Sequence, residues 1–283
     1  MLDIHFIREH ADEVRRAIEV KQVDLDLDRV LDQHQAFVGR RQALDELNRE
    51  RNENAKRVPS ATPAEREVLV QRGRAIAAEI RQSEQELREA EARLNELLLL
   101  VPNIPDPEAP IGGEEDAVEV RRWGEARRAG EAGGALRDQV ELLELNDWAE
   151  FERPSRVAGA RNFMLKGPAV VLEMALWRLA IDMLMARDFT AVSVPSMARE
   201  SAFLGTGHFP TGRDQVYYLP EDDLYLSGTA EVLANSLHAG EILPAESLPI
   251  RYAAFSPCFR REAGSAGRDV RGLIRVHQFT KIE

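Results

Sequence analysis

The sequence predicts an α+β protein: an N-terminal antiparallel coiled-coil helical arm, followed by a domain with an antiparallel β-sheet flanked by helices. One observation is a heptad stripe, in which apolar or small residues alternate by four and three positions and thereby favour a coiled coil. The stripe consists of Ile76, Ile80, Ser83, Leu87, Ala90, Leu94, Leu97 and Val101. The other is that only one long helix separates the later apolar runs, which favours an antiparallel sheet over a doubly wound parallel one.

The arm is predicted as two long helices joined by a tight turn. Residues 28–58 are charged and helix-prone, with Val30, Phe37 and Leu44 recurring every seven residues. The run 59–63, Pro-Ser-Ala-Thr-Pro, breaks the helix, and Thr62 is placed to cap the next one. At 1.5 Å per residue, each arm helix would be roughly 45–55 Å long. We therefore predict an arm domain over 1–101, with a short helix over 1–20 and the hairpin at about 28–100.

A linker and a second domain follow the arm. Four prolines and Gly112-Gly113 mark a linker over 102–113, which leaves 114–283 for the second domain. The predicted elements of that domain are a short strand at 118–123, a turn at 130–134, helices at 136–151 and 168–187, and strands at 191–194, 215–219, 223–228, 250–260 and 271–282.

The charge of the chain is uneven. The net charge is −12, which by itself argues against nucleic-acid binding, although 33 of the 37 basic residues are arginines, whose planar groups fit phosphate and carboxylate. Residues 40–74 carry nine basic against six acidic side chains. This end of the arm is either a solvated coiled-coil face or a surface that contacts RNA phosphates. The candidate contacts are Arg40, Arg41, Arg49, Arg51, Arg57, Arg72 and Arg74.

Several common functional classes lack their signatures. One cysteine, Cys258, excludes an internal disulfide and a four-cysteine zinc site, and it favours a cytoplasmic location. The sequence holds no phosphate-binding loop of the Gly-x-x-x-x-Gly-Lys type, no His-Glu-x-x-His zinc motif and no Gly-x-Ser-x-Gly elbow. The N-terminus is not a signal peptide, and no uncharged apolar run reaches the ~18 residues of a membrane span.

The segment 251–283 is the densest in chemistry. It has seven basic against three acidic residues, and it is predicted as a strand, a Gly-rich loop and a second strand. Alternation along the second strand would place Arg275 and Phe279 on one face. An arginine beside an aromatic ring suits a nucleotide, because the ring stacks on the base while the guanidinium neutralises phosphate.

Residues 259–283 closely resemble motif 2 of class II aminoacyl-tRNA synthetases, in the form characteristic of the seryl-tRNA synthetase family. Residues 226–231, Leu-Ser-Gly-Thr-Ala-Glu, resemble the serine-binding Thr-x-Glu motif of that family. Residues 172–195 are similar to motif 1, which builds the dimer interface, and the hairpin is similar to the arm that grips the long variable stem of the cognate tRNA. The resemblance therefore spans the whole chain.

The resemblance implies ATP-dependent activation of L-serine to seryl-adenylate and transfer of the seryl group to tRNA(Ser), and also to tRNA(Sec). It implies a homodimer, with ATP as substrate and Mg²⁺ bridging the phosphates, and it assigns no residue of this chain as a metal ligand. It assigns Arg260 and Arg275 to catalysis, with Arg260 touching both the α-phosphate and the serine carboxylate. The serine site would be Thr229, Ala230, Glu231, Arg260 and Glu283. The ATP site would be Arg260, Arg261, Glu262, Arg275, Val276 and Phe279.

Individual roles also follow from the resemblance. Glu262, expected on the same strand as Arg260, would accept from the adenine amino group while Phe279 stacks on adenine. Arg275 would meet the γ-phosphate, and Glu283 would accept from the amino and hydroxyl groups of serine. An acceptor for the hydroxyl discriminates against alanine, because that acceptor is otherwise left unpaired.

The family continues to a third motif beyond the position that corresponds to Glu283. We therefore expect this chain to be a synthetase cut before that motif, and inactive by itself. A non-catalytic tRNA-binding homologue or an inactive fragment is the alternative, although such a module needs neither the Thr-x-Glu pair nor Arg260 and Glu262. A purely structural coiled-coil protein is a third interpretation, which the long sequence after the arm disfavours.

Overall fold

A computed structural model describes residues 1–125, 136–263 and 272–283 of the chain. These residues form two compact units, 1–122 and 123–283, which are described one at a time. The predicted turn at 130–134 and the loop 264–271 lie outside the described residues. No helix among the described residues is long and apolar enough to cross a bilayer.

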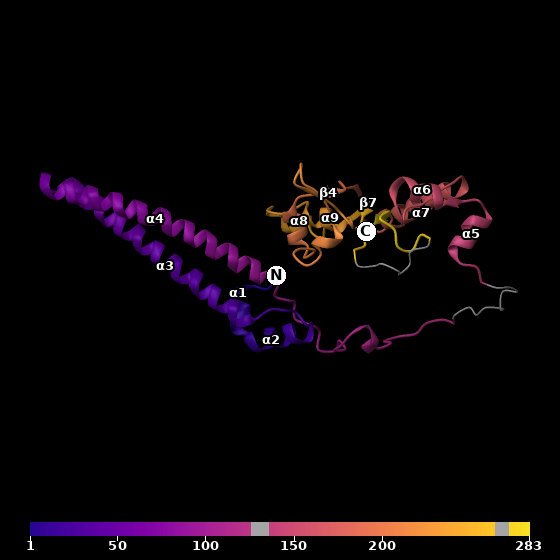
Figure 1. Ribbon diagram of the computed structural model, residues 1–283, viewed down its shortest axis with the longest axis horizontal. Helices are drawn as coiled ribbons and strands as arrows, with labels where there is room; N and C mark the ends of the chain where they lie inside the picture. The colour runs from indigo at the N-terminus through magenta and orange to yellow at the C-terminus, as the bar shows by residue number, and fades with distance from the viewer. Residues whose placement is uncertain (126–135, 264–271) are drawn as a thin grey trace. The chain divides into compact units, whose positions relative to one another are not determined.

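The first unit is dominated by the predicted hairpin. Helix α3 (Leu27–Arg57) packs along α4 (Pro63–Leu98), and a short 3₁₀ turn at Val58–Ser60 joins them (Figure 1). Ile76, Ile80, Ala90 and Leu94 of the heptad stripe are buried, as a coiled-coil seam requires. The coiled-coil arm predicted from the heptad stripe is thus confirmed.

The prediction of one helix over residues 1–20 is wrong. The structure has α1 (Ile4–Glu9) and α2 (Ala11–Val20), separated at His10, whose backbone leaves the helical region at φ −119° and ψ 38°. The break lets both short helices contribute to one cluster at the base of the arm. The cluster consists of Ile7, Val14, Ile18, Leu27, Val30, Leu94, Leu98 and Val101.

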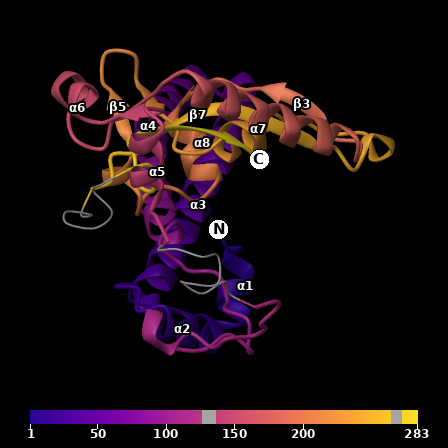
Figure 2. The same cartoon turned by 90° about the vertical axis from the view of Figure 1, so that its right-hand side faces the viewer.

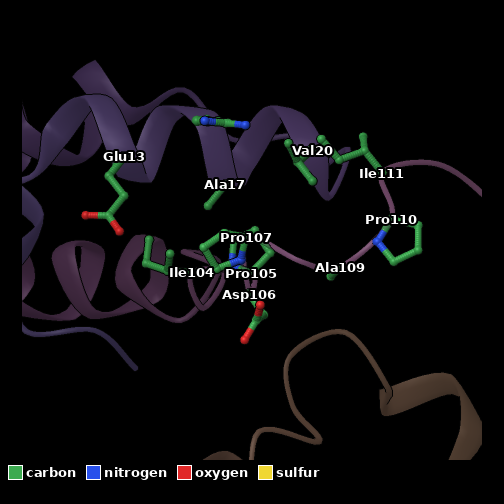
Figure 3. Close-up of a pocket in the computed structure, with 11 residues that line it drawn as sticks. Glu13, Ala17, Val20, Ile104, Pro105, Asp106, Pro107, Ala109, Pro110 and Ile111 are labelled. Carbon is green, nitrogen blue, oxygen red and sulfur yellow. The ribbon is translucent and has the colours of Figure 1, made fainter. Parts of the chain in front are cut away.

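The proline-rich segment after Val101 lies against α2. Figure 3 shows Glu13, Ala17 and Val20 of α2 pointing toward Ile104 and the prolines of this segment around a small pocket. Neither the predicted serine and ATP residues nor the arm arginines line this pocket. The strand predicted at 118–123 is wrong, since residues 117–123 are irregular and Val120 and Trp123 are largely exposed.

The turn of the hairpin carries a capping box. Thr62 Oγ1 accepts from the Glu65 backbone N–H at 3.5 Å, and Glu65 Oε2 accepts from the Thr62 backbone N–H at 2.9 Å. The two residues thereby satisfy donors that the first turn of α4 cannot pair within the helix. Hydrogen bonds from both Thr62 groups lower the pKa of Glu65.

We expect Thr62→Ala to destabilise the start of α4 by about 1 kcal/mol, the usual value of such a cap. Hydrogen exchange of the amides of residues 63–66 should accelerate. Ser60→Ala is the matched control, because the Ser60 hydroxyl donates to the Arg57 carbonyl and caps no helix start. Equal acceleration in both variants would contradict a capping role for Thr62.

The second unit begins with short elements. Helix α5 (Gln139–Leu145) is shorter than the predicted helix 136–151, and β1 (Ala149–Glu150) pairs antiparallel with β2 (Met164–Leu165) beyond α6 (Glu152–Ala158). Helix α7 (Pro168–Met185) then follows close to the predicted bounds.

Two three-stranded sheets form the body of this unit. One has the order β4 (Met197–Ala198), β6 (Leu224–Leu226), β5 (Tyr217–Leu219), with antiparallel pairs throughout. Its residues pack with α8 (Glu200–Gly205) and α9 (Glu231–Ser236) in a core centred on Phe203, Phe209 and Tyr225.

The other sheet carries the predicted site. Its order is β3 (Thr190–Ser193), β7 (Tyr252–Phe259), β8 (Gln278–Ile282), and α7 lies along it (Figure 2). The β7–β8 pair is antiparallel, as predicted, but β3 pairs with β7 in parallel. The chain between β3 and β7 includes all of the first sheet, which is long enough for the crossover that a parallel pair needs.

Candidate active site

The predicted serine residues meet at one end of β8. Thr229 and Ala230 lie between β6 and α9, both buried, and Thr229 Oγ1 donates to Glu283 Oε2 at 2.5 Å. The backbone N–H of Glu231, at the start of α9, donates to the same oxygen at 3.2 Å. Three of the predicted residues, from two segments more than 50 positions apart in sequence, are thus joined around one carboxylate.

Hydrogen bonds within the loop and to neighbouring segments fix the loop that holds Thr229. The buried Ser227 hydroxyl donates to the Thr229 carbonyl at 2.6 Å, and the Phe259 N–H donates to the Ser227 carbonyl at 2.8 Å. The Ser227 N–H in turn donates to the Ser196 carbonyl at 2.8 Å. The side chain of Glu231 makes no hydrogen bond or ion pair within the described residues, and it is exposed beside this loop.

Glu283 is held as an anion. Burial raises the pKa of this carboxyl, but hydrogen bonds from Lys281 and Thr229 and the charge of Lys281 outweigh burial and place the pKa below its ordinary value. A carboxylate that remains charged and half-enclosed is suited to accept from an ammonium group.

Arg260 lies beside the Thr229 loop and over an aromatic ring. Its Nε donates to the Gly228 carbonyl at 3.2 Å, and its guanidinium carbon is 5.1 Å from the centre of the Phe279 ring. Gly228 permits this approach, because a Cβ there would lie 3.1 Å from Arg260 Cγ. Phe279 also lines a cavity of about 370 Å³ bordered by Arg161 and Trp177.

The prediction that Arg275 and Phe279 share one strand face is wrong. Strand β8 begins only at Gln278, so Arg275 lies in the irregular segment before it and has no strand alternation. The guanidinium over Phe279 belongs instead to Arg260, from the end of the neighbouring strand.

Glu262 also differs from the prediction, because β7 ends at Phe259 and Glu262 lies beyond it with φ 53°. Its nearly buried carboxylate accepts from Arg275 Nε at 2.5 Å and lies 3.9 Å from the Arg161 guanidinium. Two predicted ATP residues therefore pair with each other. Val276 is buried, while Arg261 is exposed and donates its backbone N–H to the Gln215 carbonyl at 2.9 Å.

Sequence reasoning missed two residues that support this site. Arg161 precedes β2 and approaches Glu262 with a side chain that is only 8% exposed. Gln215 precedes β5, and its Nε2 donates to the Ala263 carbonyl at 3.1 Å. Neither residue belongs to a local motif, because their contacts join segments distant in sequence.

Cys258 lies in β7 two residues before Arg260, and burial raises the pKa of its thiol.

The arm arginines fall into two groups. Arg72 donates to both carboxylate oxygens of Glu50, at 2.7 and 2.8 Å, and to Glu79 at 2.9 Å. Arg72 of α4 thereby bridges to α3, which holds Glu50, and the hydrogen bonds with Glu50 raise the pKa of Arg72. The other six form no ion pair within the described part of the chain: Arg40, Arg41, Arg49, Arg51, Arg57 and Arg74.

The chain matches two family models. Residues 1–105 match the seryl-tRNA synthetase N-terminal domain, and residues 217–283 match the tRNA synthetase class II core domain (G, H, P, S and T). These segments contain the arm and the Thr229–Glu283 site, respectively.

Two relatives and one solved structure show what the whole chain is similar to. The whole chain is 51% identical to 66% of a serine–tRNA ligase of Deinococcus radiodurans and 39% identical to 67% of serine–tRNA ligase 1 of Streptomyces avermitilis. It also matches 68% of the crystal structure of seryl-tRNA synthetase from Pyrococcus horikoshii complexed with ATP, with a TM-score of 0.82 and 33% identity. The chain thus spans about two thirds of the length of the relatives it matches. With two curated relatives and a solved structure in agreement, the chain belongs to the seryl-tRNA synthetase family of class II serine–tRNA ligases.

Proposed function

We propose that this protein activates L-serine with ATP and transfers the seryl group to tRNA(Ser). The observation that supports this proposal most is that groups suited to the amino acid and to the nucleotide lie close together along β8 and at the residue that follows it. Glu283, joined to Thr229, directly follows β8. Phe279, which lies in β8 four residues before Glu283, is under the guanidinium of Arg260. Family membership supports the same reaction.

The proposed chemistry uses positioning and charge. Glu283, Thr229 and Glu231 hold the ammonium and hydroxyl of serine, and Phe279 stacks on adenine. Arg260, between them, holds the serine carboxylate and the α-phosphate together, because a guanidinium fork offers donors to two anions at once. The carboxylate then attacks phosphorus and pyrophosphate leaves. The protein supplies no covalent nucleophile in this step.

Binding of ATP in the proposed pose requires the ion pair between Arg275 and Glu262 to rearrange. Arg275 donates to Glu262 in the structure, whereas the proposed roles place Arg275 on the γ-phosphate and Glu262 on the adenine amino group. ATP would therefore separate this pair. Mg²⁺ would accompany ATP as the counter-ion of its phosphates.

The RNA partner is proposed to lie along the arm. Six arginines of the segment 40–74, which carries net positive charge, form no ion pair with any other residue that the structure describes, and they suit the phosphates of the long variable stem of tRNA(Ser). The same shape recognition would admit tRNA(Sec). A cytoplasmic location, supported by the single reduced Cys258, agrees with this partner.

We further propose a homodimer built on α7. Leu172, Leu176, Leu179 and Met183 follow each other at spacings of four and three, and all are exposed within the described part of the chain. An apolar stripe of this size on a helix favours burial against another subunit.

Replacing Leu176 and Leu179 together by Glu should weaken the dimer by at least about 100-fold, because two apolar contacts are lost and two charges are placed in the interface. Sedimentation equilibrium measures this change. Val157→Glu, on the exposed face of α6, is the control and should leave the association constant unchanged. A dimer that survives the double replacement would place the interface elsewhere.

The activity is tested by serine-dependent exchange of pyrophosphate into ATP. The assay compares the chain, which we expect to be inactive by itself, with a fusion of the chain to the remaining third of the D. radiodurans relative, since the chain matches 66% of that relative. Exchange by the fusion that depends on serine, and serylation of tRNA(Ser) over other tRNAs, is the expected result. A folded fusion that exchanges with another amino acid, or with none, would contradict the proposed function.

A further inference from the structure

Lys281 contacts both side chains that are proposed to recognise the hydroxyl and ammonium of serine. Its Nζ donates to Thr229 Oγ1 at 3.2 Å and forms an ion pair with the Glu283 carboxylate. Lys281 lies on β8 between Phe279 and Glu283, and alternate residues of a strand point to one face. Lys281 therefore stands between Phe279, the proposed stacking partner of adenine, and the Glu283 carboxylate of the proposed serine site.

The hydrogen bonds fix the direction of one proton. An ammonium group has donors only, so Thr229 Oγ1 must accept from Lys281. The single hydroxyl proton of Thr229 is then directed to Glu283 Oε2, at 2.5 Å. Thr229 retains one lone pair, which is available to a donor on a ligand.

The same lysine divides the two oxygens of Glu283. Oε2 accepts from the Thr229 hydroxyl and from the Glu231 backbone N–H, whereas Oε1 faces Lys281. The carboxylate is thus held from both sides, at 13% exposure, with acceptor capacity left on Oε1. A ligand ammonium and hydroxyl would meet acceptors that are already charged and oriented.

This arrangement differs from that of a surface pair. Lys166 binds the Asp147 carboxylate, but Asp147 is 85% exposed and has no second partner within the described residues. Such an exposed pair organises nothing else and contributes little. Lys281, by comparison, connects two groups that themselves come from different parts of the fold.

We propose that Lys281 is a positioning residue of the serine site, which fixes the Glu283 carboxylate and the Thr229 hydroxyl in the orientation that receives the ammonium and hydroxyl of serine. The proposal rests on the proposed function and adds a residue to it. Lys281 acts through its two neighbours, so its loss should weaken recognition of the seryl group and spare the nucleotide.

Two probes that differ only in the amino acid separate these effects. One is 5′-O-(N-L-seryl)sulfamoyladenosine, a stable analogue of seryl-adenylate, and the other is 5′-O-sulfamoyladenosine, which lacks the serine. Calorimetric titration of the 283-residue chain with each probe gives two dissociation constants. Their ratio measures what the seryl group, together with the anionic acyl sulfamate that it creates, adds to binding of the nucleoside.

Lys281→Met removes the charge and the donors at similar length, and it should reduce this ratio by about tenfold, the usual range for a charged hydrogen bond. Binding of sulfamoyladenosine should stay the same. Lys281→Arg keeps charge and donors and should restore most of the ratio. Lys166→Met, the matched control, removes a lysine–carboxylate pair away from the site and should leave both constants unchanged.

An unchanged ratio in a Lys281→Met variant with an unaltered unfolding midpoint would overturn the proposal. Equal losses for both probes, or a Lys281→Arg variant as weak as Lys281→Met, would also overturn it, since either result shows that charge and donors on the seryl group are not what matters. A wild-type chain that binds the seryl probe no better than sulfamoyladenosine would instead contradict the proposed function, and the role of Lys281 would fall with it.

Discussion

Replacement of Arg260 by Ala should reduce kcat/KM for serine-dependent pyrophosphate exchange by about 1,000-fold, the upper range for removing one transition-state donor. The guanidinium is proposed to hold two anions that repel each other as they react. Its position is fixed by the Gly228 carbonyl at 3.2 Å and by the Phe279 ring. Without it, the carboxylate and the phosphate lose their shared cation. The measurement is exchange by the fusion enzyme over a range of serine and ATP concentrations.

Two further variants make the result specific. Arg260→Lys keeps the charge without the planar fork, so it should recover only a small part of the activity. Arg153→Ala, which removes an exposed arginine paired with Glu150, is the control and should behave as the wild type. If Arg260→Ala lowered exchange less than tenfold with the fold intact, the catalytic role assigned to Arg260 would be wrong.

Shortening the arm should separate the two halves of the reaction. Replacing residues 41–82 by a short Gly-Ser turn removes most of the candidate RNA contacts but keeps Val30, Leu94 and Leu98 in the cluster at the base. We expect kcat/KM for serylation of tRNA(Ser) to fall by at least about 100-fold, because several phosphate contacts are lost together. Pyrophosphate exchange, which needs no tRNA, should be unchanged.

Charge reversal without shortening tests the same surface. Exchanging Arg49, Arg51 and Arg74 for Glu should weaken tRNA binding and reduce its dependence on salt, since fewer counter-ions are released. The control exchanges Arg88, on the part of α4 nearer the base, for Glu. A shortened arm that still serylates tRNA(Ser) at the wild-type rate would refute RNA contact by the hairpin.

The arm could be predicted from sequence because its determinants are local. A heptad stripe, a Pro-flanked break and a capping residue define two helices and the turn between them. The short helices at the N-terminus were less predictable, since apolar spacing alone does not reveal the break at His10.

The sheet was only partly predictable. The strands β3 and β7 were recognised, but their parallel pairing depends on the long excursion between them. A strand was also predicted where residues 272–277 are irregular, because apolar and polar residues alternate there without the backbone forming a ladder.

The candidate site shows the same division. Motif resemblance identified Thr229, Arg260 and Glu283, and the structure brings the first and last into contact. The pairing of Arg275 with Glu262 and the approach of Arg161 depend on side-chain packing between distant segments. No local pattern encodes such contacts.

The cluster at the base of the arm has a mechanical consequence. Helix α3 runs 31 residues from this cluster to the turn, which at 1.5 Å per residue is about 46 Å. A rotation of only about 5° at the base would move the turn by about 4 Å, more than the length of a hydrogen bond. The buried contacts of Val14, Val30 and Leu94 thereby limit how far the turn between α3 and α4 can move. A cavity made at the base should broaden the range of positions of the turn at the far end without changing any residue there.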